Sequence, residues 1–233
     1  MAAILTTSLV LASCSSNEPN YVEQGYPTAP EQSQAEPAAD TNAYTPIAQL
    51  ADADWLAETS STSDIPERAL AAYAGAALRI ADEQPECGIG WNTLAGIGRV
   101  ESVHGAYGGA RIDERGQVSP AIIGVPLDGS SGVAEIVDTD GGELDGDQEY
   151  DRAVGPMQFI PGTWQLEGRD GNLDGEADPH NIDDAVLTAA SYLCGEERDV
   201  TTDNGWNSAV TTYNQSRSYA IDVAEYAGQV LVV

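Results

Sequence analysis

The segment that decides the fold, residues 91–105, reads WNTLAGIGRVESVHG. Leu94, Ile97 and Glu101 are spaced i, i+3 and i+7, so they share one face if the segment is helical. Gly105 is suited to stop such a helix. The spacing therefore predicts a helix over the first fourteen of these residues, with a carboxylate on its apolar face.

Glu101 lies one turn from the expected C-terminus of this helix, where the helix macrodipole is negative. Apolar surroundings and this dipole both disfavour the ionised carboxylate, so we expect the pKa of Glu101 to be raised. A glutamic acid that keeps its proton near neutral pH can act as a general acid in glycosidic cleavage. Periodicity alone leaves an alternative open, in which Glu101 is an exposed side chain paired with Arg99.

Helical patterns flank this segment on both sides. Asp64, Pro66 and Glu67 form a helix start signal, with Asp64 as the N-cap. Residues 105–150 are instead rich in Gly, Asp, Ser and Pro, and the apolar pieces 120–126 and 133–137 within them are expected to pair as a hairpin. We therefore predict a mainly α domain over 64–233 with a loop-rich insertion and a small β-hairpin. Its further helices are expected over 69–80, after Pro161, and over 183–194, 205–213 and 219–230.

The chain before residue 64 has the pattern of a signal peptide followed by a linker. Residues 2–11 are apolar and have the length of a signal-peptide core, and the following LASC, which ends at Cys14, resembles a bacterial lipobox. This predicts a signal peptide over 1–13 and a lipid anchor at Cys14, which would hold the protein at the cell membrane, outside the cytoplasm. An ordinary cleaved signal with a chance cysteine is the alternative.

Residues 14–63 contain five prolines, eight acidic residues and no basic residue. Such a composition does not bury enough apolar surface to offset the entropy lost on ordering. We therefore expect a disordered acidic linker with a reach of roughly 40 Å, with a weak helix around 47–57.

The charge balance excludes several functions. The 233 residues include 38 Asp and Glu but nine Arg and no Lys, which gives a net charge of −29. Chemistry that needs a lysine, such as a P-loop or a Schiff base, is excluded. Nucleic acid is not an expected partner, because phosphate binding needs clustered positive charge. We expect a monomer without an organic cofactor.

Two cysteines remain besides Cys14. In a protein exported from the cytoplasm, Cys87 and Cys194 are expected to form a disulfide. Two buried free thiols are the alternative.

Three ordered patterns together resemble a known enzyme family. They are Glu101-Ser102 after an apolar helix, Gly-Pro-Met-Gln-Phe-Ile-Pro over 155–161, and Thr-Tyr-Asn over 212–214 followed by Tyr219. In this order they resemble the lytic murein transglycosylases, specifically the membrane-bound lytic transglycosylase B type, across residues 65–227. The stretch 108–113 is similar to lipoprotein members of that group. The resemblance implies a lysozyme-like fold.

The resemblance also implies an activity and a site. These enzymes cleave the β-1,4 bond between N-acetylmuramic acid and N-acetylglucosamine in peptidoglycan and leave a 1,6-anhydro sugar, with one glutamate as general acid and base. That position is Glu101 in this chain. The residues implied to bind or border the glycan are Ser102, Met157, Gln158, Phe159, Tyr192, Tyr213, Asn214 and Tyr219.

Two other functions remain open on the sequence. A lysozyme-like muramidase would pair Glu101 with a second acid such as Asp113, Asp138 or Asp151 and release a reducing end. A non-catalytic, calcium-stabilised wall-binding lipoprotein would use the same fold without chemistry. Met157 and Phe159 could also be plain core residues, and Tyr213 could serve in packing alone.

An acidic loop over 170–178 follows the start of an EF-hand calcium loop, DxNxDGE. The twelfth position is Asn181 instead of the usual glutamate, and the family resemblance implies that Asp184 takes its place. The loop thus predicts a structural Ca²⁺ site, with a solvated turn as the alternative. Its expected ligands are Asp170, Asn172, Asp174, Asp184 and the carbonyl of Glu176.

A second acidic run covers residues 138–151. The spacing of its acids fits no known metal-binding loop, so we expect a solvated loop. Binding of a second cation is the alternative. His104 and His180 have no cysteine partner nearby in the sequence, so both are expected to be hydrogen-bonded structural residues.

Overall fold

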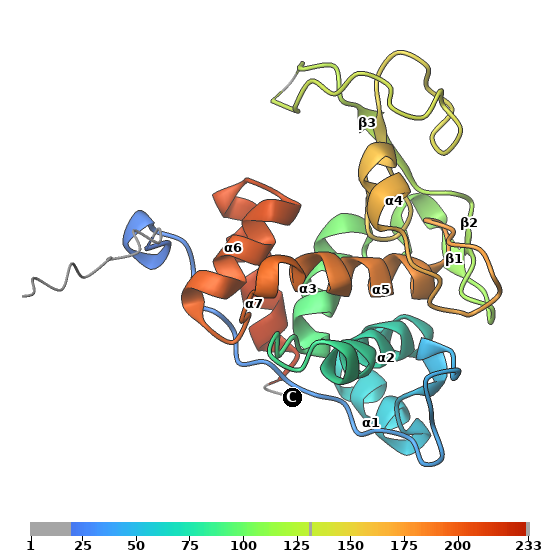
Figure 1. Ribbon diagram of the computed structural model, residues 1–233, viewed down its shortest axis with the longest axis vertical. Coiled ribbons are helices and arrows are strands. Elements are labelled where there is room, and N and C mark those ends of the chain that lie inside the picture. The colour runs from blue at the N-terminus through green and yellow to red at the C-terminus, as the bar shows by residue number, and fades with distance from the viewer. Residues whose placement is uncertain (1–19, 131, 232–233) are drawn as a thin grey trace, which may run out of the picture.

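The computed structural model describes residues 20–130 and 132–231, and over these residues the prediction of a mainly α fold is confirmed (Figure 1). The short strands form two separate antiparallel pairs. The helices are α1 (Ala53–Ser63), α2 (Glu67–Glu83), α3 (Trp91–Ser102), α4 (Pro161–Glu167), α5 (Ile182–Leu193), α6 (Asp203–Tyr213) and α7 (Arg217–Gln229).

The core forms where α3 packs between α2 and α7, while α5 packs against α2. Leu94 and Ile97 of α3 are fully buried, as the apolar spacing predicts. Burial of each such side chain stabilises the fold by about 2 kcal/mol. Ala72 and Ala76 of α2 are also fully buried, and these small residues let neighbouring helices approach closely. This packing fixes the end of α3 that carries Glu101.

The strands differ from the expected hairpin. Strand β1 (Arg111–Ile112) pairs with β2 (Val118–Ser119), and β3 (Ile123–Pro126) pairs with β4 (Arg152–Val154). The prediction that 120–126 pairs with 133–137 is therefore wrong. Residues 133–137 make isolated bridges only, and the loop after β3 projects from the domain (Figure 1).

Arg152 supplies the physical reason for this pairing. Its guanidinium donates to the Gly124 carbonyl at 3.2 Å and forms an ion pair with Asp147 at 2.9 Å, while its backbone N–H donates to the Asp145 carboxylate at 2.6 Å. The bond to Gly124 joins β4 to β3 across 28 positions, while the two acids hold Arg152 from within the preceding loop. A hydrophobic pattern does not reveal such polar contacts.

The expected disordered linker over 14–63 is corrected for the residues that the structure describes. From residue 20 on the segment packs on the domain, and it buries Ile47, Leu50 and Leu56 in the main core. The expected weak helix over 47–57 is a 3-10 turn (Ile47–Gln49) followed by α1. A few well-placed apolar residues supply the burial that the average composition does not suggest.

The helix start signal at Asp64 is also corrected. Asp64 ends α1 with a left-handed backbone (φ 58°), and α2 begins after Pro66. The N-cap of α1 is Asp52, whose carboxylate accepts hydrogen bonds from two N–H groups of the first turn.

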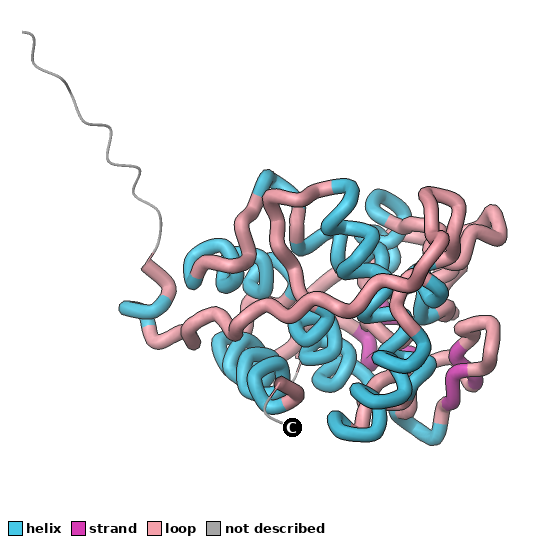
Figure 2. The backbone as a smooth tube through the Cα atoms, turned by 90° about the horizontal axis from the view of Figure 1, so that it is seen from below, coloured by secondary structure: helices cyan, strands magenta, loops and turns pink. Residues whose placement is uncertain are grey.

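Residues 21–38, which we call the strap, begin with a 3-10 turn (Val22–Gln24) and then run in an extended path across the helices (Figure 2). The Gln32 side-chain oxygen accepts from the N–H of Gly90, the N-cap of α3, at 2.9 Å, and the Ser33 carbonyl accepts from the Trp91 N–H at 3.0 Å. Helix α3 has no capping side chain of its own at this end. The strap therefore satisfies N–H groups that a helix N-terminus leaves free.

The disulfide between Cys87 and Cys194 is confirmed, with 5.5 Å between the two Cα atoms. It joins the loop before α3 to the end of α5 across 107 positions. A crosslink over so long a loop contributes about 2–4 kcal/mol.

Two predictions, the signal peptide over 1–13 and the lipidated Cys14, lie outside the described residues. Over the part of the chain that the structure covers, none of the helices combines the length and apolar character that a membrane span requires.

Candidate active site

Helix α3 ends abruptly just after Glu101. Val103 and His104 both have left-handed backbones, with φ of 55° and 58°. The N–H groups of these two residues donate back to carbonyls of the last turn, at Arg99 and Gly98. The reversal ends the helix within one turn of Glu101, as the sequence predicts.

Ser102 fastens this turn to the loop that carries the second motif. Its hydroxyl donates to the Pro156 carbonyl at 2.6 Å and accepts from the Gly105 N–H at 2.8 Å. Gly155 in the same loop has φ of 77°, and a Cβ there would collide with the Pro179 carbonyl. Glycine at 155 therefore lets this loop pass close to the loop before α5.

Glu101 is mostly covered and has one neutral partner. The Tyr219 hydroxyl of α7 donates to Glu101 Oε1 at 2.6 Å, and no ion pair to Glu101 occurs among the described residues. Burial raises the pKa of Glu101 to about 7, and the hydrogen bond from Tyr219 opposes that rise. The sequence expectation of a raised pKa is therefore met, and the Arg99-paired alternative is not.

Tyr213 joins α6 to the loop of the second motif. Its hydroxyl donates to the Met157 carbonyl at 2.7 Å, and its ring meets Phe159 edge to face at 5.6 Å. Burial raises the pKa of Tyr213, and the charge of Glu101 raises it further. Burial and the charge of Glu101 also raise the pKa of Tyr219. The structure thus brings the three motifs around one carboxyl group.

Three residues expected to contact the glycan are corrected to supporting roles. Ser102 is 1% exposed, Met157 0% and Phe159 3%, so none of them offers surface to a ligand. Met157 and Phe159 belong to the main core, and the partners of the Ser102 hydroxyl, at Gly98, Pro156 and Gly105, are all protein groups. The local sequence could not separate groove from core here, because apolar residues next to a motif suit both.

Tyr219 is also buried, at 7% exposed, whereas the other residues expected to contact the glycan keep some exposed surface. The Gln158 amide turns inward and donates to the Gly155 carbonyl at 2.9 Å. Asn214 is exposed, and its side-chain oxygen accepts from the Ser216 N–H at 3.0 Å. Tyr192 of α5 is half-buried, with its ring 6.1 Å from that of Tyr213. These three side chains and Tyr213 retain surface that a ligand could contact.

A buried polar chain beside Glu101 escaped the sequence interpretation. The Tyr73 hydroxyl lies 3.1 Å from His104 Nδ1, and the Tyr226 hydroxyl lies 2.8 Å from His104 Nε2. Burial lowers the pKa of His104 to about 4, and the charge of Arg99 lowers it further. The prediction that His104 is hydrogen-bonded is confirmed, since both ring nitrogens have a tyrosine partner. The sequence pattern did not mark Tyr73 as a functional residue, because it lies on an otherwise Ala-rich face of α2.

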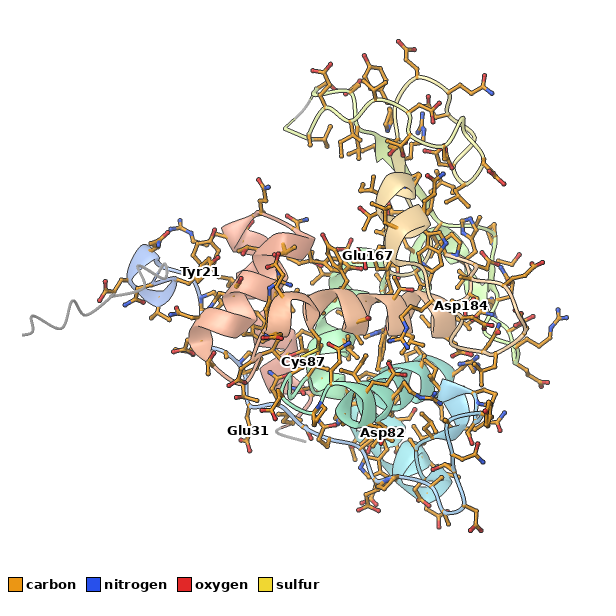
Figure 3. All side chains as sticks on the ribbon, in the orientation of Figure 1. Tyr21, Glu31, Asp82, Cys87, Glu167 and Asp184 are labelled. Atoms are coloured by element: carbon orange, nitrogen blue, oxygen red, sulfur yellow. A yellow bond between two sulfur atoms is a disulfide. The ribbon has the colours of Figure 1, made fainter. Side chains whose placement is uncertain are left out.

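The loop over 170–178 wraps around Asp184, at the start of α5 (Figure 3). The two carboxylate oxygens of Asp184 accept N–H bonds from Gly171, Asn172 and Asp178 at 2.7–3.2 Å. Burial raises the pKa of Asp184 to about 6, against the lowering effect of these three bonds, and the charge of Asp170 raises it slightly. Asp184 thus lies beside the first acid of the expected calcium loop.

The acids of this loop carry oxygen donors, but Asp170, Asp174 and Asp184 are not among the described acidic groups whose ligand atoms all lie within 4.8 Å of one another. Asp170, Asn172 and Asp174 offer side-chain oxygens, and Glu176 offers an exposed backbone position. Oxygen donors of this kind are what Ca²⁺ prefers. A cation here would also compensate the buried charge of Asp184, which forms no ion pair within the described residues.

A second group of acids is better ordered than a solvated loop requires. Oxygens of Asp138, Asp140 and Asp151 all lie within 4.8 Å of one another, so the group could hold a metal ion. Asp151 is fully buried and accepts from the N–H and the hydroxyl of Thr139 at 2.8 and 2.7 Å. Ligand spacing did not reveal this group, because Asp151 reaches it from the far end of the run.

Chemically, the site can protonate a leaving group and take a proton back. With a pKa of about 7, Glu101 carries its proton in about half of the molecules at pH 7, and it is only partly covered. Two surface hollows of about 770 and 400 Å³ lie elsewhere, along residues 195–199.

Comparison with protein-family models, with curated proteins and with solved structures found no match to this chain.

Proposed function

We propose that this chain is a peptidoglycan lytic transglycosylase with a lysozyme-like domain. The observation that carries the proposal is the state of Glu101. Its carboxyl has a pKa of about 7 and its sole hydrogen-bond partner among the described residues is the neutral hydroxyl of Tyr219. General acids work best when their pKa lies near the working pH.

The proposed reaction proceeds in two proton transfers at Glu101. The carboxyl first gives its proton to the oxygen between N-acetylmuramic acid and N-acetylglucosamine, and the bond from that oxygen to the muramyl anomeric carbon breaks. The muramyl 6-hydroxyl then bonds to the same carbon and returns its proton to the Glu101 carboxylate. The products are a 1,6-anhydromuramyl end and a free N-acetylglucosamine end, and the enzyme regains its starting state.

The surroundings of Glu101 favour this route over hydrolysis with two carboxylates. A second carboxylate at the distance that glycosidases use would raise the pKa of Glu101 by repulsion. Burial and Tyr219 account for the shift of Glu101 without such a contribution. Of the acids considered for a muramidase, Asp113 is exposed beside Arg115, and Asp151 is buried against Thr139.

The side chains around Glu101 have distinct roles in this proposal. Tyr219 orients the carboxyl through its hydroxyl, and Tyr213 holds the loop of the second motif. Gln158, Tyr192 and Asn214, which keep exposed surface, contact the sugar and its acetamido groups. Ser102, Met157 and Phe159 hold the two halves of the site together.

Two further parts belong to the proposal. Asp170, Asn172, Asp174, Asp184 and the Glu176 carbonyl bind a structural Ca²⁺, which stabilises the loop before α5. Cys14 carries a lipid that anchors the protein to the cell membrane outside the cytoplasm. The partner of the site is the peptidoglycan glycan strand.

Product analysis tests the proposal. Purified wall is digested in water labelled with ¹⁸O, and the fragments are weighed by mass spectrometry. We expect anhydromuramyl ends without ¹⁸O from the wild type, and no new ends from Glu101→Gln. Reducing ends that contain ¹⁸O would support the muramidase instead, and wall binding without any new ends would support the non-catalytic module.

A further inference from the structure

The chain is fastened to the domain as early as Tyr21. The hydroxyls of Tyr21 and of Thr211 on α6 lie 3.5 Å apart, and the Arg217 guanidinium donates to the Gln24 carbonyl at 3.3 Å. The rings of Tyr21 and Tyr26 meet edge to face at 5.3 Å. Figure 3 shows Tyr21 at the edge of the domain beside α6.

The following residues of the strap are held by the helices that build the site. The Asn207 amide of α6 donates to the Pro27 carbonyl at 2.8 Å, and the Ala29 N–H donates to Asp203 at 2.7 Å. Farther on, the Asn92 side chain of α3 accepts from the Ser33 N–H at 3.0 Å. Asn207 and Asn92 are both fully buried, and their bonds to the strap are partly buried, whereas the bond between Ala29 and Asp203 is exposed.

This attachment shortens the tether between a lipid at Cys14 and the folded domain. Seven peptide steps separate Cys14 from Tyr21, and a chain extends at most about 3.5 Å per residue, so the tether spans at most about 25 Å. A free linker from Cys14 to residue 64 would span up to roughly 170 Å. The strap thus removes most of the reach that the composition suggests.

The site lies on the anchored part of the domain. Thr211, which holds Tyr21, and Tyr213, which holds the loop beside Glu101, are two positions apart on α6. A domain of this length has a radius of gyration of roughly 17 Å. With the tether added, Glu101 stays within on the order of 70 Å of the membrane.

The surface around Tyr21 does not suit docking on an anionic bilayer. Tyr21 shares the wall of a hollow of about 400 Å³ with three acids, Glu196, Glu197 and Asp199, and with one base, Arg198, which forms an ion pair with Glu196 at 2.8 Å. Acidic side chains are repelled by anionic headgroups within a Debye length. The tether, and not a lipid-binding face, therefore sets the distance between the site and the membrane.

We infer that the strap confines the proposed activity to glycan strands beside the membrane and keeps Glu101 from strands deeper in the wall. The inference rests on the proposed function and on lipidation at Cys14. It assigns the substrate by position: the strands within reach are those nearest the membrane, whereas a free linker would have given access to the wall at large.

The test uses the full lipidated chain in a supported lipid bilayer. Glycan strands are attached to lipids of the same bilayer through spacers of graded length, and their release is followed by fluorescence. We expect release to fall at least tenfold once the spacers hold the strands beyond about 100 Å. A 40-residue Gly/Ser insertion between Pro19 and Asn20 should restore release at long spacers. The same Gly/Ser sequence added after Val233 is the matched control and should restore nothing.

Three outcomes overturn the inference. They are equal release at all spacer lengths, an insertion without effect, and a chain that does not float with vesicles. Failure of the proposed function is distinguishable, because the unanchored Cys14→Ser chain should cleave strands on all spacers equally. If that chain cleaves none, the activity and not the tether is wrong.

Discussion

Two buried carboxyl groups of this domain, Glu101 and Asp184, are treated very differently by their surroundings. Burial raises the pKa of both, to about 7 and about 6. Glu101 receives one hydrogen bond, from the side chain of Tyr219, whereas Asp184 receives three from backbone N–H groups of one loop. The surroundings of Glu101 leave its proton free for transfer to a ligand. The carboxylate of Asp184 instead holds the backbone of the loop in place.

This difference separates a chemical role from a structural one. A backbone loop folded around a carboxylate depends on that carboxylate for its own order, because N–H groups left without a partner are costly. A carboxyl group whose only partner is one tyrosine contributes little to the stability of the fold. When it ionises, its burial lowers the free energy of unfolding. We therefore expect opposite effects on stability when the two acids are replaced.

Replacement of Glu101 by Gln gives the largest expected effect. Loss of a general acid lowers the rate by about 10²–10⁴-fold. Between pH 4.5 and 7 the folded protein keeps the proton that the unfolded chain has lost, so the free energy of unfolding falls as pH rises. At pH 8 the cost of ionising Glu101 is about 3 kcal/mol. Glu101→Gln avoids that cost, so the inactive variant is expected to be the more stable one.

Urea unfolding of both proteins at pH 4 and pH 8, beside turnover of wall glycan, measures both effects. Wild type and variant should have similar stability at pH 4, where the carboxyl is neutral in the folded and the unfolded state. Lower stability of the variant at pH 8 would contradict the comparison. Retained turnover would show that Glu101 is not the acid.

Replacement of Asp184 by Ala should act in the reverse direction. Three loop N–H groups lose their acceptor, and the expected loss of stability is about 3 kcal/mol. With both variants measured in EDTA, Asp174→Ala is the matched control, because Asp174 is exposed in the same loop and without metal should cost less than about 1 kcal/mol. Equal losses in the two variants would refute a central role for Asp184.

Removal of Ca²⁺ tests the same loop from the ligand side. A cation that binds only the folded protein stabilises it by about 2.7 kcal/mol at a concentration of a hundred times its Kd. We expect EDTA to lower the Tm of the wild type and added Ca²⁺ to restore it. Asp184→Ala should show neither response, and an unchanged wild-type curve would remove the metal from the proposal.

The sequence predicts the parts of this site that follow a local pattern. Helix α3 and its carboxylate come from apolar spacing, and the raised pKa of Glu101 comes from that spacing together with the nearby helix end. The disulfide comes from counting cysteines. These signals are local or compositional, so no knowledge of the tertiary structure is needed to detect them.

Other features depend on partners far along the chain. The strap has an average composition typical of disorder, yet buried amides at Asn92 and Asn207 hold it in place. Tyr219 lies 118 positions from Glu101, and Tyr73 lies 31 positions from His104. In both pairs a hydroxyl selects its partner by three-dimensional position. Periodicity in one segment carries no information about such pairs.

Tyr219→Phe has the smallest expected effect and gives the finest test of the comparison. The hydroxyl of Tyr219 lowers the pKa of Glu101, so its loss should raise that pKa further. The alkaline limb of the pH–rate profile, where Glu101 loses its proton, should then move to higher pH. The ring stays in place, so the expected loss of stability is about 1 kcal/mol or less.

Tyr226→Phe separates this effect from a general disturbance of α7. Tyr226 lies on the same helix, but its hydroxyl meets His104 and not Glu101. It should cost similar stability and leave the pH–rate limb where it was. A limb that moves equally in both variants would mean that the packing of α7, and not the single hydrogen bond to Glu101, sets the proton affinity. The contrast with Asp184, whose partners are all backbone groups, would then lose its physical basis.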